Sequence, residues 1–166
     1  MTDRLTQVSA LISLGIMLSF APPSAIAADG RNTGETAVEL WQNEPETIFD
    51  ARDVKIEDFK WLARPVIIFA DAPLDPAFSQ QMELLEARLT ELTKRDVVLI
   101  RDTSPDERTD LRLTLRPRGF MLTVMGKDGR VILRKPFPWN VREISRQIDN
   151  LPIRQQEIRD ALTADQ

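Results

Sequence analysis

Four short apolar runs in the 166-residue sequence have the length and composition of buried β-strands. They lie at 65–70, 96–101, 120–125 and 130–135. The first three are apolar at consecutive positions, which is typical of strands that are covered on both faces of a sheet. Between the last two runs, the turn from Gly126 to Gly129 contains Asp-Gly, which is a strong signal for an antiparallel hairpin.

Helical patterns separate and follow these runs. Asp75-Pro76 is typical of an N-cap followed by proline at the first helical position, and the helix that it begins should extend to about Lys94. A strand, a helix and a second strand in this order require a right-handed crossover and a parallel pair. A short helix is expected over 107–115, and another after Asn140, where Glu143 occupies the capping-box position. A further turn or two should begin at Pro152.

The N-terminal 27 residues have the pattern of a secretory signal peptide. An uncharged apolar stretch over 8–21 precedes a proline pair and Ala25-Ile26-Ala27, a suitable cleavage site. The stretch is shorter than the roughly 20 residues that a membrane span needs. We therefore expect a periplasmic or secreted protein, cleaved near Ala27; the alternative is an uncleaved anchor, which would be its only contact with a membrane.

The rest of the chain suits one domain. Residues 28–46 are polar with little periodicity, which predicts a flexible leader that Trp41 could attach to the domain. The domain itself is expected over 47–166, and its first part, 47–62, should form short turns or a short helix.

Composition excludes several kinds of chemistry. The sequence contains no cysteine, histidine or tyrosine. Thiol redox reactions, thiolate nucleophiles, Ser-His dyads and histidine-bound zinc are therefore impossible for this chain alone. We expect no cofactor. Export and a pI near 5.0 also argue against a nucleic-acid partner.

The order of strand, helix, parallel strand, connector, antiparallel hairpin and helix is the core order of the thioredoxin-like fold. The sequence therefore predicts an α/β protein with a four-stranded mixed sheet flanked by helices. Its strands should lie in the order second, first, third, fourth, with the third antiparallel to the others. Where thioredoxins carry Cys-x-x-Cys, this chain has 71–75 (DAPLD), and Gly119 stands where their cis-proline would precede the third strand.

Several motifs together resemble a family known only as a domain of unknown function. The resemblance extends over roughly 59–159 and rests on Trp61-x-x-Arg64-Pro65, Arg95-Asp96, the 126–129 turn and a segment over 148–157 (IDNLPIRQQE). The family occurs in exported bacterial proteins and in extracellular matrix proteins that contain sushi repeats or coiled coils. It implies the thioredoxin-like fold, but it carries no established activity to this chain.

Three carboxylates should lie at the carboxyl ends of the two parallel strands: Asp71, Asp75 and Asp102. Together they would suit a hard cation, or divide acid and base roles between them. Alternatively, Asp75 caps the helix, Asp102 begins a turn and Asp71 is solvated, since aspartate is favoured in caps and turns.

Two further groups are candidates for binding. Lys127 and Asp128 at the hairpin tip would contact a partner, or would only form the turn with Gly126 and Gly129 at positive φ. Asp149, Arg154, Gln156 and Glu157 would form either a recognition surface or a polar clamp that fixes the angle of the last helix.

Basic residues gather in the second half of the chain. Residues 28–94 hold 14 acids and seven bases, whereas 108–146 hold ten bases and three acids. A set of arginines there would suit phosphate or an acidic glycan: Arg112, Arg116, Arg118, Arg130, Arg134 and Arg142. The alternative is a solvated surface with intramolecular pairs. The sequence thus favours a non-catalytic binding or structural module that holds a protein or an anionic ligand, with a carboxylate-based, possibly metal-dependent enzyme as the alternative.

Overall fold

The computed structural model describes residues 35–164. The predicted signal peptide, over 1–27, lies outside these residues, as does the first part of the predicted leader. Within 35–164, no helix combines the length and the apolar character that crossing a membrane requires.

A five-stranded mixed sheet forms the centre of the domain. Its strands are β1 (Ile48–Asp50), β2 (Arg64–Phe69), β3 (Val97–Asp102), β4 (Met121–Met125) and β5 (Val131–Lys135). They lie in the order β1-β3-β2-β4-β5, with β4 antiparallel to both of its neighbours. The predicted order and direction of four strands are confirmed. The sequence did not predict β1, which pairs in parallel with β3 and becomes the edge of the sheet.

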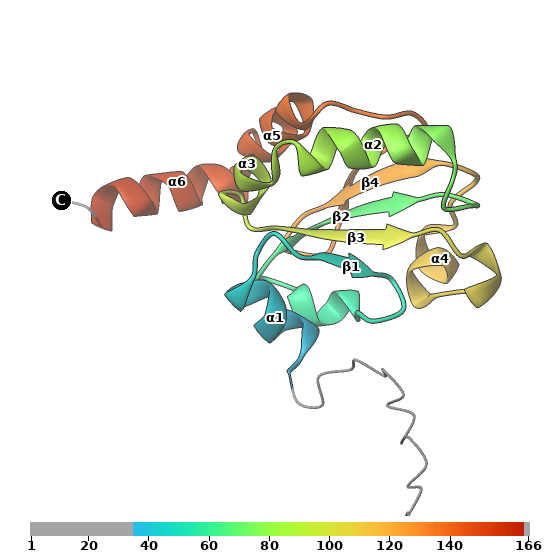
Figure 1. Ribbon diagram of the computed structural model, residues 1–166. Helices are drawn as coiled ribbons and strands as arrows, with labels where there is room; N and C mark the ends of the chain where they lie inside the picture. Colours follow the sequence, from blue (N-terminus) through green and yellow to red (C-terminus); the bar gives the residue numbers. More distant parts are fainter. Residues whose placement is uncertain (1–34, 165–166) are drawn as a thin grey trace, which may run out of the picture. The chain divides into compact units, whose positions relative to one another are not determined.

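Helices cover both faces of this sheet (Figure 1). On one face lie α2 (Pro76–Glu86), α3 (Leu89–Thr93) and α5 (Val141–Asp149). On the other lie α1 (Ala37–Asn43), the 3₁₀ turn η1 (Ile56–Phe59) and α4 (Asp110–Leu115), which follows the 3₁₀ turn η2 (Pro105–Glu107). Side chains alternate along β2 between two cores: Val66 and Ile68 join the first, and Ile67 and Phe69 join the second. The continuous apolar run is thus explained by a strand that is buried on both faces.

Helix α1 corrects the predicted flexible leader. Thr36 and Glu39 form a capping box, in which the Thr36 side chain accepts from the Glu39 amide and the Glu39 carboxylate accepts from the Thr36 amide. Trp41 is buried in the second core, as its predicted attachment requires, and its Nε1 donates to the Val97 carbonyl oxygen at 3.2 Å. The prediction of flexibility was therefore wrong for 37–43, where local capping and one buried aromatic side chain hold a helix.

The remaining helices follow the sequence pattern with small differences. Asp75 caps α2 as predicted, but the single helix expected up to Lys94 divides into α2 and α3. Asn140 caps α5 by accepting from the Arg142 amide, whereas Glu143 pairs with Arg146 and does not complete a capping box. The last helix, α6 (Pro152–Ala164), has no buried residue and extends away from the sheet in Figure 1.

Candidate functional site

The two ends of the sheet carry different chemistry. The carboxyl ends of β2 and β3 lie beside the start of β4 and the end of β5, because Phe69 pairs with Met121 and Leu122 pairs with Lys135. This is the strand-end region where a thioredoxin-like fold would place its active site. The amino ends of β2 and β3 lie at the opposite end of the sheet, next to the β4–β5 turn and the start of α6. We call these two ends of the strands the carboxyl edge and the amino edge.

At the carboxyl edge, Asp102 is held by an intramolecular network. Its carboxylate accepts from Thr109 Oγ1 at 2.7 Å and from Arg112 Nε at 2.7 Å. The guanidinium of Arg112 also donates to the carbonyl oxygens of Ala70 and Asp102 and lies over the Phe69 ring. Arg112, which the sequence placed in a basic surface, is therefore a largely buried side chain that joins α4 to the ends of β2 and β3.

The other two carboxylates do not join Asp102 around a shared centre. Asp75 Oδ1 accepts from the amides of Ala77 and Phe78 and so serves as the α2 cap. Asp71 is largely exposed and approaches Arg112 Nη1 at 3.6 Å. Among residues 35–164, no three acidic side chains gather closely enough to hold a metal ion. These contacts agree with the structural alternative for the three aspartates.

A basic pocket of about 270 Å³ lies at the same edge of the sheet. We call it the strand-end basic pocket, and its lining comprises four basic side chains and three apolar ones: Arg116, Arg118, Arg134, Lys135, Phe120, Met121 and Pro136. The segment from the end of α4 to the first residue of β4, and the segment from the end of β5 to Pro136, supply these side chains. Arg116 ends α4 in the left-handed conformation, with φ of 49°, which turns the chain into the first of these segments.

The four cations of this pocket have no acidic partner among the described residues. No carboxylate of that part of the chain lies within 4.0 Å of their charged nitrogens. Arg134 Nη1 donates to the Leu115 carbonyl oxygen at 2.8 Å, and Lys135 Nζ lies 4.5 Å from the centre of the Trp139 ring. These contacts fix the direction of two cations without neutralising them.

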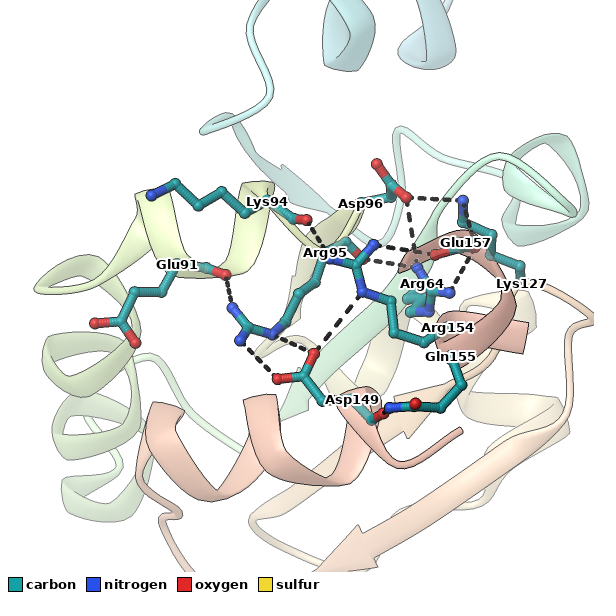
Figure 2. Close-up of polar contacts among 10 residues, drawn as sticks. All are labelled: Arg64, Glu91, Lys94, Arg95, Asp96, Lys127, Asp149, Arg154, Gln155 and Glu157. Atoms are coloured by element: carbon teal, nitrogen blue, oxygen red, sulfur yellow. Dashed lines mark hydrogen bonds and ion pairs between the residues drawn. The ribbon is translucent and has the colours of Figure 1, made fainter. Parts of the chain in front are cut away.

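At the opposite edge, seven charged side chains form what we call the amino-edge ion cluster: Arg64, Arg95, Asp96, Lys127, Asp149, Arg154 and Glu157 (Figure 2). Arg64 is fully buried at the start of β2 and donates to Glu157 Oε1 at 2.8 Å and to the Arg95 carbonyl oxygen at 2.9 Å. Lys127 Nζ lies 3.0 Å from Glu157 Oε1 and 2.8 Å from Asp96 Oδ2.

The cluster fastens the end of α5 and the start of α6 to the sheet. Arg95 donates to both carboxylate oxygens of Asp149, at 2.9 and 2.7 Å. Arg154 also pairs with Asp149 at 3.8 Å and with Glu157 at 3.1 Å. Arg154 also donates to the Lys94 carbonyl oxygen at 3.0 Å. This geometry agrees with a polar clamp on the last helix.

The carboxyl of Glu157 shows the strength of this clamp. Burial raises its pKa, but hydrogen bonds from Arg64, Lys127 and Arg154 outweigh burial and lower the pKa from 4.5 to about 2. Glu157 is therefore ionised at any physiological pH, and it serves as the common counter-ion of three cations.

The remaining predicted residues are divided between α6, the hairpin turn and β5. Gln156 bonds to Asp160 and Arg159 along the exposed side of α6. Asp128 accepts from the Arg130 amide in the hairpin turn, where Gly129 has φ of 81° but Gly126 does not adopt a positive φ. Arg130 precedes β5 and lines a pocket near the hairpin turn, whereas Arg134, near the end of β5, lines the strand-end basic pocket.

Sequence reasoning missed two features that matter here. Arg64 was considered only as part of the motif Trp61-x-x-Arg64-Pro65 and not as a charged partner, and Lys135 was not included among the binding residues. The signal for Arg64 was its position within an apolar strand, since an arginine is rarely fully buried unless it is paired.

Comparison with known families identifies the domain. Residues 55–157 match the family described as a domain of unknown function (DUF4174). The chain belongs to this family. Both the strand-end basic pocket and the amino-edge ion cluster lie within the matched residues. A search of curated proteins found no match.

Solved structures show the fold of this DUF4174 domain. The thioredoxin peroxidase I of Plasmodium yoelii is similar with a TM-score of 0.52 at 15% identity, over 66% of this chain and 86% of that one. Prx1a of Plasmodium yoelii, modified at its N-terminus, is similar with a TM-score of 0.50 at 15% identity, over 66% of this chain and 86% of that one. The protein thus has the thioredoxin-like fold, and because it lacks cysteine it performs no thiol redox chemistry.

Proposed function

We propose that the protein is an exported, non-catalytic binding module that holds an anionic ligand in the strand-end basic pocket. The ligand is either a free polyanion or an anionic group on a partner protein. The observation that carries the proposal is the set of four cations, Arg116, Arg118, Arg134 and Lys135, that line one pocket without a described carboxylate nearby. Like charges brought together in this way repel one another, so a multivalent anion lowers their electrostatic energy.

The chemistry of the side chains supports this choice of ligand. Arginine presents planar, forked donors that fit the oxygens of phosphate and carboxylate groups. Phe120, Met121 and Pro136 add apolar walls, which lower the local dielectric and strengthen such contacts. The predicted signal peptide and the resemblance of the sequence to domains of exported bacterial and extracellular matrix proteins support a location outside the cytoplasm. The alternative of carboxylate-based catalysis gains no support, because Asp75 and Asp102 are engaged in a cap and an ion pair.

Calorimetric titration with inorganic tripolyphosphate tests the proposal. We expect binding that weakens as salt rises, because screening acts on exposed charges. The double variant Arg118→Glu/Lys135→Glu should bind at least about tenfold more weakly, since each charge-assisted hydrogen bond contributes roughly 1.5–3 kcal/mol.

Arg142→Glu is the matched control. Arg142 is exposed and belongs to the same predicted basic set, but it does not line the pocket. Its reversal should change the dissociation constant less than twofold. Equal losses in the two variants would show that general surface charge, and not this pocket, attracts the anion.

A further inference from the structure

A second pocket, on the opposite edge of the sheet, has the features of a separate ligand site. Its volume is about 360 Å³, within the range of about 300–1,000 Å³ that is typical of small-molecule sites. Ile132, Leu151, Pro152 and Ile153 form its apolar walls. Arg64, Lys127 and Arg130 bring cations to its lining. We call it the amino-edge pocket.

The start of α6, at this pocket, leaves two backbone donors available. Leu151 precedes the helix and has no side-chain acceptor for a cap, and Pro152 has no amide hydrogen. The first helical hydrogen bond is donated by the Gln155 amide to the Leu151 carbonyl oxygen. Within the described residues, the amides of Ile153 and Arg154 donate to no acceptor. An uncapped helix N-terminus favours an anion, through these amides and through the helix dipole.

A second, independent observation is the unpartnered Nε of Arg64. The Arg64 side chain is fully buried and lines the same pocket, yet its Nε has no hydrogen-bond partner among residues 35–164. A buried donor without a partner destabilises the protein, and an acceptor brought by a ligand would remove this cost.

The net charge of the neighbouring amino-edge ion cluster also favours an anionic ligand. The amino-edge ion cluster contains four bases and three acids, so it carries one surplus positive charge. Asp128 is the one carboxylate that lines the pocket, and it is engaged with the Arg130 amide at 3.1 Å and lies 3.7 Å from Arg130 Nε. A ligand with a single negative charge would therefore balance this surplus positive charge.

From these features we infer that the amino-edge pocket binds a small monocarboxylate with an apolar body. Its carboxylate lies at the start of α6, where it accepts from the free amides and approaches Arg64, and its apolar body lies against Ile132 and Ile153. The carboxylate belongs either to a free aliphatic acid or to the C-terminus of a peptide that ends in an apolar residue. This site is independent of the strand-end basic pocket, which suits multivalent anions.

Titration of the full-length chain, followed by amide NMR shifts and calorimetry, tests the inference with four probes. They are hexanoate and its neutral analogue hexanamide, and acetyl-Ala-Leu with a free carboxylate and the same peptide with a C-terminal amide. Each acid should bind at least tenfold more tightly than its amide and should shift the Ile153 and Arg154 amide signals. Tighter binding of hexanoate than of the peptide would identify the ligand as a free aliphatic acid. Tighter binding of the peptide would identify it as the C-terminus of a peptide chain.

The variant Ile153→Asp separates binding from folding. It places a carboxylate beside the free amides, where an acidic residue in the first turn suits the helix, so the fold should remain intact. The same carboxylate competes with the ligand, and we expect at least a tenfold loss of hexanoate affinity. Leu162→Asp, at an exposed position on the same helix, is the control and should change affinity less than twofold. Equal binding of acids and amides, no binding of any probe, or unchanged affinity in Ile153→Asp would overturn the inference.

Discussion

Arg64 and Glu157 are 93 positions apart in the sequence, and Arg64 Nη2 donates to Glu157 Oε1 at 2.8 Å. The arginine begins a central strand, and the glutamate belongs to the last helix. Arg64 is the more buried partner, since its side chain is 1% exposed compared with 25% for Glu157. The pair therefore neutralises an almost completely buried cation, and it also fixes the position of α6.

The first prediction concerns the loss of this counter-ion. Glu157→Gln keeps the size of the side chain but leaves Arg64, Lys127 and Arg154 with one fewer negative charge. We expect the free energy of unfolding to fall by about 2–4 kcal/mol, because breaking a buried ion pair leaves an uncompensated charge. Urea unfolding measures this change. Glu143→Gln breaks only an exposed pair with Arg146 and should cost no more than about 1 kcal/mol; losses of equal size would contradict a special role for Glu157.

The second prediction concerns acid stability. The pKa of Glu157 is about 2 in the folded protein and 4.5 as an ordinary side chain. Because the folded pKa is the lower one, this carboxylate contributes its full stability above pH 4.5 and loses it as the pH falls towards 2. Unfolding measured between pH 7 and pH 2 should show a smaller decline in Glu157→Gln than in the wild type across this window. Parallel curves would show that other carboxyl groups control the acid response.

The third prediction concerns the different contributions of Asp102 and Asp71 to stability. The side chains of Asp102 and Arg112 are 1% and 9% exposed and lie 2.7 Å apart. Asp102→Asn should therefore lower the free energy of unfolding by about 3–5 kcal/mol. Asp71→Asn, at an exposed position, should change it by no more than about 0.5 kcal/mol. Thermal unfolding of both variants checks this difference, and a tolerated Asp102→Asn would mean that the network with Arg112 contributes little.

The fourth prediction concerns the attachment of α1. Trp41→Ala removes a buried ring and its hydrogen bond to the Val97 carbonyl oxygen. We expect a loss of about 3–5 kcal/mol, as for other buried aromatic residues, and faster hydrogen exchange over 37–43. Trp61→Ala is the matched control, because Trp61 is 62% exposed and should tolerate the change. Unchanged exchange over 37–43 in Trp41→Ala would mean that the capping box alone holds the helix.

Local patterns were sufficient to predict most of the fold. The buried strand β2 was evident from its unbroken apolar residues, and the β4–β5 hairpin from its Asp-Gly turn. The sequence did not reveal β1, because three residues from Ile48 to Asp50 are too few to show a period and their pairing with β3 is a long-range contact. Helix α1 was missed although Thr36 and Glu39 have capping-box spacing, since the helix is short and its surroundings are polar.

The candidate sites were less accessible to sequence reasoning. The Arg154–Glu157 pair follows from helical spacing, but Arg64 meets Glu157 only because the chain returns to the same edge of the sheet. The partners of Arg112 could not be read from composition, so it was placed with surface arginines although it is buried against Asp102. Charge counts showed that the second half of the chain is basic, and only the structure showed which of those cations lack described partners.

The short outer strand β1 also has a consequence for the behaviour of the protein in concentrated solution. It pairs with β3, whose backbone N–H and C=O groups would otherwise offer neighbouring molecules a template for intermolecular pairing. At the far margin, β5 ends in Arg134 and Lys135 and is followed by Pro136, which lacks an amide hydrogen. Self-assembly into fibrils by lateral strand addition is thus disfavoured at both margins.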